Sequence, residues 1–201
     1  MTKILALSDI HGDMERIEIA VKKAKTENAD VIIISGDLTM AGQEIPGLLK
    51  PLNELGKPIL IIPGNHDTPE LTKFLSYVYN NIHNLNGYYF VHDGIGFFGC
   101  AGTGLGYFGL RDETILQTLE KSNEKISELE KRVMIVHEPP YKTKLDWIGF
   151  HAGNKGVREA IQKLKPTIVV HGHIHETFGM TDKLNGTEII NAGHDGCIIE
   201  L

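Results

Sequence analysis

Five short clusters of Asp, Asn and His each come directly after an apolar, strand-like run of the sequence. Carboxylate and amide oxygens mixed with neutral imidazole nitrogens suit divalent ions such as manganese, iron, zinc or nickel. Cysteine is absent from all five clusters. The clusters therefore predict a metal centre, and they read Asp9-Ile10-His11, Gly36-Asp37, Gly64-Asn65-His66-Asp67, His137 and His171-Gly172-His173-Ile174-His175.

The number of candidate ligands exceeds the needs of one ion. Asp9 and His11 are two residues apart in a segment that leaves a strand, so their side chains should project to the same side and bind one ion together. The same holds for His173 and His175. Six or seven ligands are more than one tetrahedral or octahedral ion accepts once water is included. We therefore expect two ions that share Asp37.

The elements that must position these clusters read as alternating strands and helices. Apolar, β-rich runs predict strands at residues 3–7, 31–34 and 59–62. Asp13 can cap a helix after the first strand. A second amphipathic helix is predicted between the other two strands by Leu48, Leu49, Leu52 and Leu55. This order implies a largely parallel sheet, and the carboxyl ends of its strands bring ligands together at one edge.

The second half of the chain alternates in a looser way. Residues 88–91 and 95–100 predict a hairpin around a turn at His92-Asp93-Gly94, and residues 102–109 predict a glycine-rich loop. Helices are expected at residues 114–130 and 156–164, with an irregular stretch at 138–154. Further strands are expected at 133–136 and 167–170, and two or three β runs between 177 and 199.

Length and charge limit the class of protein. The 201 residues predict one globular domain, residues 1–201, with an ordinary apolar fraction. A formal net charge of −6 offers no basic face for a long nucleic acid. One segment could still form a local basic patch or an ordinary solvated surface, because it contains Lys142, Lys144, Lys155 and Arg158. The oligomeric state is not indicated by the sequence.

Apolar runs and cysteines indicate the compartment. No apolar run approaches the roughly 20 residues needed to cross a bilayer. A strand-like run begins directly after Thr2, which leaves no room for a leader peptide, so we expect a cytoplasmic protein. Cys100 and Cys197 lie in apolar stretches without CxxC spacing, and we expect both to be reduced core residues.

The five clusters, in this order, resemble those of the calcineurin-like metallophosphoesterases from Asp9 to His175. The resemblance implies an α/β fold, a β-sandwich of two mixed sheets flanked by helices. It also implies that Asp37 bridges two divalent ions and that His66 faces the substrate. By the same resemblance one ion is held by Asp9, His11 and His175, and the other by Asn65, His137 and His173.

A narrower resemblance concerns the substrate. The segments 137–140, 172–176 and 191–193 are similar to the small branch of this family that includes cyclic-nucleotide phosphodiesterases. Glu138 stands where that branch commonly has Gly, and His194-Asp195 stand near its usual Ser or Pro. The expected substrate is therefore a small phosphodiester, with a cyclic nucleotide as one candidate.

The expected reaction is attack by a hydroxide that bridges the two ions, which lower the pKa of water and clamp the phosphoryl oxygens. We assign His66 as the general acid that protonates the leaving oxygen. Asp67 is expected either to orient His66 or to cap the helix that starts at Pro69. A phosphomonoesterase is the alternative enzyme, and a non-catalytic scaffold of the same fold is the alternative class.

Other residues have open roles. His171 is expected to end its strand and to pack or hydrogen-bond locally. His151 and His194 lie in loops that could border the pocket. Aromatic faces can hold nucleobases, and packing within a loop is the alternative for Tyr107, Phe108, Tyr141 and Trp147.

Overall fold

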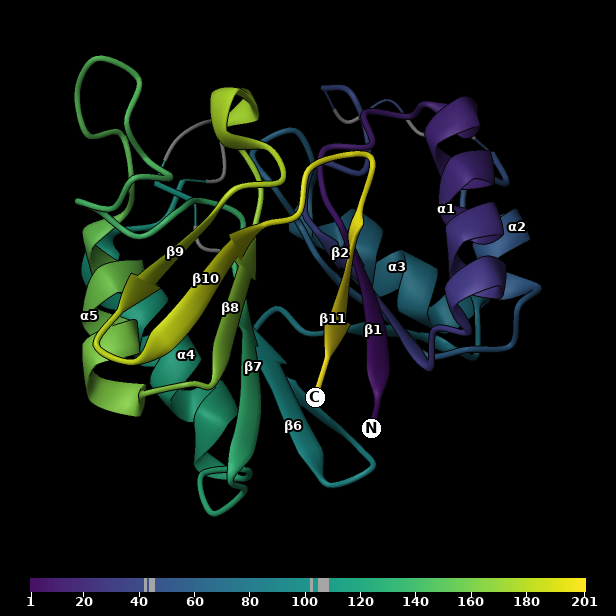
Figure 1. Ribbon diagram of the computed structural model, residues 1–201. Helices are drawn as coiled ribbons and strands as arrows, with labels where there is room; N and C mark the ends of the chain where they lie inside the picture. Colours follow the sequence, from purple (N-terminus) through teal and green to yellow (C-terminus); the bar gives the residue numbers. More distant parts are fainter. Residues whose placement is uncertain (42, 44–45, 102, 105–108) are drawn as a thin grey trace.

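A computed structural model describes residues 1–41, 43, 46–101, 103–104 and 109–201, so the predicted loop residues Tyr107 and Phe108 lie outside the described residues. Two sheets face each other in the centre of the molecule, and helices cover their outer faces (Figure 1). This is the predicted α/β fold of two mixed sheets flanked by helices.

The first sheet has the order β11-β1-β2-β3-β4. Its central strands are continuous apolar runs buried on both faces, as expected for strands between two layers. Adjacent strands are parallel except for the last strand of the chain, which returns antiparallel to the first. The strands are β1 (Lys3–Leu7), β2 (Val31–Ser35), β3 (Ile59–Ile62), β4 (Ile82–Asn84) and β11 (Cys197–Glu200).

Three helices cover the outer face of the first sheet, on the right in Figure 1. In α1 (Met14–Glu27) the cap is the predicted Asp13, which accepts the N–H groups of Glu15 and Arg16. The second predicted helix is wrong in length, because α2 (Lys50–Asn53) has only four residues. Leu52 is buried within this short helix, Leu48 and Leu49 are buried in the turn before it, and Leu55 is partly buried after it. The third helix is α3 (Pro69–Val78).

The second sheet has the order β5-β6-β7-β8-β10-β9. The predicted hairpin forms, and Asp93 and Gly94 make its turn with φ values of 47° and 75°. The next strands run parallel up to β10, and β9 pairs antiparallel at the edge. The strands are β5 (Tyr89–His92), β6 (Ile95–Gly99), β7 (Lys131–Ile135), β8 (Ile168–His171), β9 (Thr181–Leu184) and β10 (Thr187–Asn191).

Two helices, α4 (Asp112–Glu124) and α5 (Lys155–Leu164), cover the outer face of the second sheet. The helix predicted at 114–130 ends earlier than expected. After Glu124 the N–H groups of Ile126 and Leu129 bond three residues back in successive turns. A Cβ on Gly96 would crowd both side chains, so the two residues close over this bare part of β6 rather than continue the helix.

One apolar cluster lies between the two sheets, where Ile33 and Leu60 of the first belong to the same buried group as Phe97 and Val170 of the second. Separate clusters join each sheet to its own helices. No disulfide joins the two cysteines, and both pack in or against apolar clusters as predicted. None of the described helices is long and apolar enough to span a bilayer.

Candidate metal centre

The predicted site residues meet in loops at the carboxyl ends of β1, β2, β3, β7 and β8, at the top of Figure 1. A cavity of about 540 Å³ opens there. Asp9 and His137 are fully buried beside it. The other six predicted site residues line the cavity, namely His11, Asp37, Asn65, His66, His173 and His175.

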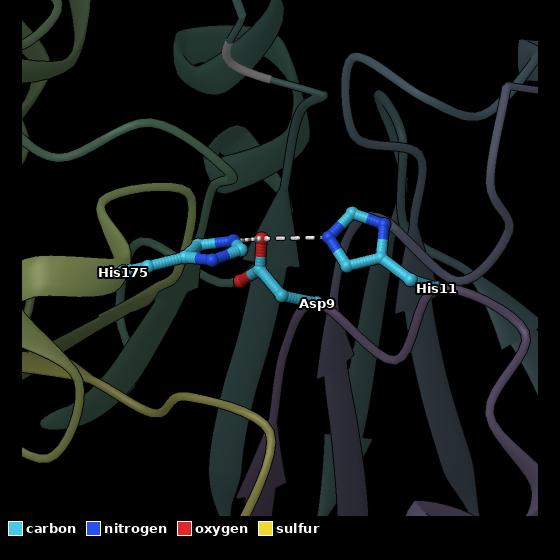
Figure 2. A group of neighbouring side chains, drawn as sticks. All are labelled: Asp9, His11 and His175. Carbon is cyan, nitrogen blue, oxygen red and sulfur yellow. Dashed lines mark ion pairs between the residues drawn. The ribbon is translucent and has the colours of Figure 1, made fainter.

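The Asp9 carboxylate lies between two imidazoles (Figure 2). Its Oδ2 accepts a 3.0 Å hydrogen bond from the backbone N–H of His173. Its Oδ1 lies 3.8 Å from His11 Nε2 and 3.4 Å from His175 Nε2. This oxygen is buried and makes no hydrogen bond within the described structure. A buried carboxylate oxygen without a donor is costly unless a cation faces it, so these three side chains fit a metal ion.

The two carboxylate oxygens of Asp37 also have different partners, one a backbone N–H group and the other two imidazoles. Its Oδ1 accepts a 2.9 Å hydrogen bond from the backbone N–H of His66. Its Oδ2 lies 3.9 Å from His11 Nε2 and 3.3 Å from His137 Nε2. The second oxygen therefore faces one imidazole of each predicted ligand group, which is the position that a bridging ligand requires.

His137 presents one defined nitrogen to the site. Its Nδ1 donates a 2.9 Å hydrogen bond to the Ser35 carbonyl, so Nε2 is the nitrogen left to bind an ion. Nε2 lies 2.9 Å from Asn65 Oδ1. Two neighbouring ligands of one octahedral ion, with bonds of about 2.1 Å, are separated by about 3 Å, so His137 Nε2 and Asn65 Oδ1 are spaced to bind the same ion. His173 completes a second compact group with Asp37 and His137.

Four of these side chains depend on an uncommon backbone conformation. Asp9, His11, Asp37 and His173 all have left-handed φ values, from 51° to 69°. The sequence argument placed Asp9 and His11 on one side through an extended chain, and this reason was wrong because the chain turns at both residues. Left-handed backbone costs free energy outside glycine and concentrates at functional sites.

The charges of Asp37 and His137 depend on each other. Burial alone would lower the pKa of His137, but the facing charge and hydrogen bond of Asp37 raise it to about 9. Burial alone would raise the pKa of Asp37, and the facing His137 lowers it to about 2. Burial and then His137 lower the pKa of His173. In metal-free protein at neutral pH, a proton on His137 therefore supplies the positive charge between these groups.

Metal binding is expected to release that proton. An ion needs the unprotonated Nε2 of His137, whose pKa of about 9 means that it is protonated at pH 7 in chelator-treated protein. Loading at pH 7 should release about one proton from this imidazole, and the release should vanish as pH rises above 9. Titration calorimetry in buffers of different ionisation enthalpy measures it. Loading at pH 7 without proton release would contradict the pairing with Asp37.

Two glycines let the loops approach each other. A Cβ on Gly64 would overlap the backbone N and Oδ1 of Asp37, and a Cβ on Gly172 would overlap Ser8 and Asp9 Oδ2. Neither position has a left-handed φ, so the requirement is steric rather than conformational. The carboxylates of Asp37 and Asp9 therefore occupy space that a side chain at Gly64 or Gly172 would fill.

Gly64→Ala should therefore destabilise the fold by about 1–3 kcal/mol, the usual cost of overpacking, and weaken metal binding by moving Asp37. Urea unfolding and metal titration measure the two effects. Gly104→Ala is the matched control, because the nearest described atom to a Cβ there, Asn154 Nδ2, would lie at an ordinary 3.5 Å. Equal stability and metal affinity in both variants would show that the loop at Gly64 has room to spare.

The family model for calcineurin-like phosphoesterases matches residues 2–177 of the chain. The chain belongs to this family. The matched residues include all five clusters of Asp, Asn and His that the fold brings together at the cavity.

Two curated relatives are similar to this phosphoesterase at low identity. A probable cyclic nucleotide phosphodiesterase of Fibrobacter succinogenes is 27% identical over 207 residues, which cover 90% of this chain and 76% of the relative. A probable glycerophosphodiester phosphodiesterase of Arcobacter nitrofigilis is 26% identical over 177 residues, which cover 83% of this chain. The chain spans 64% of the length of that second relative.

A crystal structure from Thermus thermophilus has the same fold. It aligns with a TM-score of 0.79 at 20% identity, over 96% of this phosphoesterase and 89% of that chain. At this identity the likeness concerns the fold alone.

Asp67 has neither of its two predicted roles. Its carboxylate is buried and accepts the N–H groups of Leu38, Thr39 and Gly64 together with the Thr39 hydroxyl. The cap of α3 is Thr68 instead. Asp67 thus ties the loop after β2 to the loop after β3, and so holds Asp37 beside Asn65.

Among the residues with open roles that the structure describes, none belongs to the cavity lining of the phosphoesterase. His151 Nδ1 bonds to the buried Asp146, and its ring contacts the rings of Tyr141 and Trp147 edge-on, so these side chains pack against one another within the loop. His194 pairs with the neighbouring Asp195. His171 is buried and bonds to the adjacent Gly172 carbonyl, as predicted, and burial lowers its pKa to about 4.

Two residues near the site were missed by the sequence argument. Glu138 is buried and accepts hydrogen bonds from Thr103, Gly104 and Asn154, so it ties two loops and the start of α5 together beneath His137. Arg16 lines the cavity. The signal for Arg16 was available, because Asp13 caps a helix directly after the first cluster and brings its first turn over the site.

Proposed function

We propose that this phosphoesterase hydrolyses a small phosphodiester, such as a cyclic nucleotide, at a dinuclear metal centre. The observation that carries the proposal is the place of Asp37 Oδ2, which faces both His11 and His137 across less than 4 Å. The names of both curated relatives, each a probable phosphodiesterase, favour a diester. The proposal includes a cytoplasmic location and a small-molecule substrate.

The mixed oxygen and nitrogen donors fit two divalent ions, which would be manganese, iron, zinc or nickel. Asp37 would bridge them. Such ions, when bound, polarise phosphoryl oxygens and lower the pKa of water. One would be held by Asp9, His11 and His175, and the other by Asn65, His137 and His173.

His66 would donate a proton to the leaving oxygen. Its ring lines the cavity and lies edge-on to His11, with centroids 5.1 Å apart. Its Nδ1 accepts a 3.4 Å hydrogen bond from the backbone N–H of Ala41. The neutral ring therefore carries its proton on Nε2, the nitrogen left to meet the substrate. To act as the acid, the ring would first take up a second proton on Nδ1 in place of the Ala41 contact, and the imidazolium would then give its Nε2 proton to the leaving oxygen.

Turnover of bis-p-nitrophenyl phosphate, p-nitrophenyl phosphate and cyclic nucleotides, each with manganese, iron, zinc and nickel, tests the proposal. We expect diesters to be hydrolysed with higher kcat/KM than monoesters. A preference for monoesters would make the chain a phosphomonoesterase. No turnover with any ion would favour a non-catalytic scaffold.

A further inference from the structure

Among the described residues, the cavity lining includes one positively charged side chain that the proposed reaction does not use, Arg16. Among the described residues that line the cavity it is the only lysine or arginine. It lies in the first turn of α1, three residues after the capping Asp13. Its side chain is 27% exposed, so it borders the cavity without extending freely into solvent.

Two contacts fix the guanidinium of Arg16. Its Nη1 donates a 2.6 Å hydrogen bond to the backbone carbonyl of Asp9, and its Nε lies 3.4 Å from Asp13 Oδ2. Asp13 is held in turn, because its Oδ1 accepts the N–H groups that begin α1. The guanidinium is therefore attached both to the start of a helix and to the backbone of a predicted metal ligand.

The rest of the guanidinium has no partner in the described part of the chain. Arginine carries five N–H groups, and the contacts with Asp9 and Asp13 use two of them, which leaves Nη2 entirely and one N–H of Nη1. Such an edge matches two oxygens of a phosphate. A side chain that is already fixed loses little conformational entropy when it binds a ligand.

We propose that Arg16 binds non-bridging oxygens of the substrate's phosphate group. This inference rests on the proposed phosphoesterase function and adds the side chain that recognises the anion. A dianionic monoester gains more from the guanidinium charge than a monoanionic diester does. Arg16 therefore also sets how well the cavity accepts monoesters beside diesters.

Binding of inorganic phosphate to manganese-loaded protein, followed by titration calorimetry, tests the contact without turnover. Arg16→Ala should weaken phosphate binding by about 10- to 100-fold, as expected for hydrogen bonds to a charged group. Arg16→Lys should recover part of the loss, because it restores the charge but not the fork. Lys22→Ala is the matched control, since Lys22 is an exposed cation of the same helix, and it should bind phosphate as the wild type does.

Metal content and kinetics separate recognition of the substrate from support of Asp9. Arg16→Ala should keep its manganese, and its KM for p-nitrophenyl phosphate should rise more than its KM for bis-p-nitrophenyl phosphate, while kcat changes little. Loss of manganese, unchanged phosphate affinity, or no phosphate binding by the wild type would each overturn the inference. If the wild type hydrolyses neither ester but binds phosphate through Arg16, the proposed function fails and this inference stands.

Discussion

Asp37→Asn is expected to abolish turnover and to remove bound metal. The substitution keeps the shape of the side chain, and the amide oxygen can still accept the N–H of His66 as Oδ1 does now. The loop should therefore keep its conformation. The Oδ2 that faces His11 and His137 becomes an NH₂ group, which cannot bind a cation. The variant tests the shared carboxylate with little change of shape, and it also removes the charge that raises the pKa of His137.

The expected magnitude is large. Metal ions contribute several kcal/mol of transition-state stabilisation, so kcat/KM should fall by about a thousandfold or more. Elemental analysis of the purified variant should show the loss of at least one ion. Asp93→Asn is the control, because it makes the same change in the hairpin turn, where the side chain is exposed. A variant of Asp37 that keeps both ions and its activity would remove the basis of the dinuclear proposal.

The sequence predicted the sheet edge because strong signals coincide there. Runs such as Ile59 to Ile62 are apolar at every position, which only a strand covered on both faces tolerates, and each run ends abruptly in polar residues. Parallel strands then bring their carboxyl ends together. The convergence of Asp9 with His173, 164 residues apart, follows from these local patterns and from the family resemblance.

The sequence did not show how the strands at the edges pair or how the loops turn. Nothing local in Cys197 to Glu200 indicates that this strand returns antiparallel to β1. The left-handed turns at Asp9 and Asp37 are likewise invisible, because both residues also suit ordinary capping positions. Asp67 shows the same limit. Its carboxylate accepts the N–H groups of Leu38 and Thr39, which belong to a different loop and lie near Asp67 only in the folded chain.

His66→Ala tests whether His66 is a proton donor or a metal ligand. Its geometry fits a ligand as well, because His66 forms a compact group with His11 and Asp37. The hydrogen bond from Ala41 to Nδ1 argues against metal binding through Nε2, since it leaves the proton of the neutral ring on that nitrogen. The variant should therefore keep its ions. Its activity should fall by about 10²- to 10⁴-fold on alkyl esters, whose leaving oxygen needs a proton, and much less on p-nitrophenyl esters.

The comparison of leaving groups decides the role of His66, because loss of a ligand would slow every ester alike. Alkyl and p-nitrophenyl diesters are assayed side by side with elemental analysis of the same preparation. His92→Ala, in the hairpin outside the cavity lining, serves as the control. Full activity of His66→Ala on alkyl esters would assign the proton to another donor. Loss of an ion would make His66 a ligand, and the cavity would then need a different acid opposite the entering oxygen.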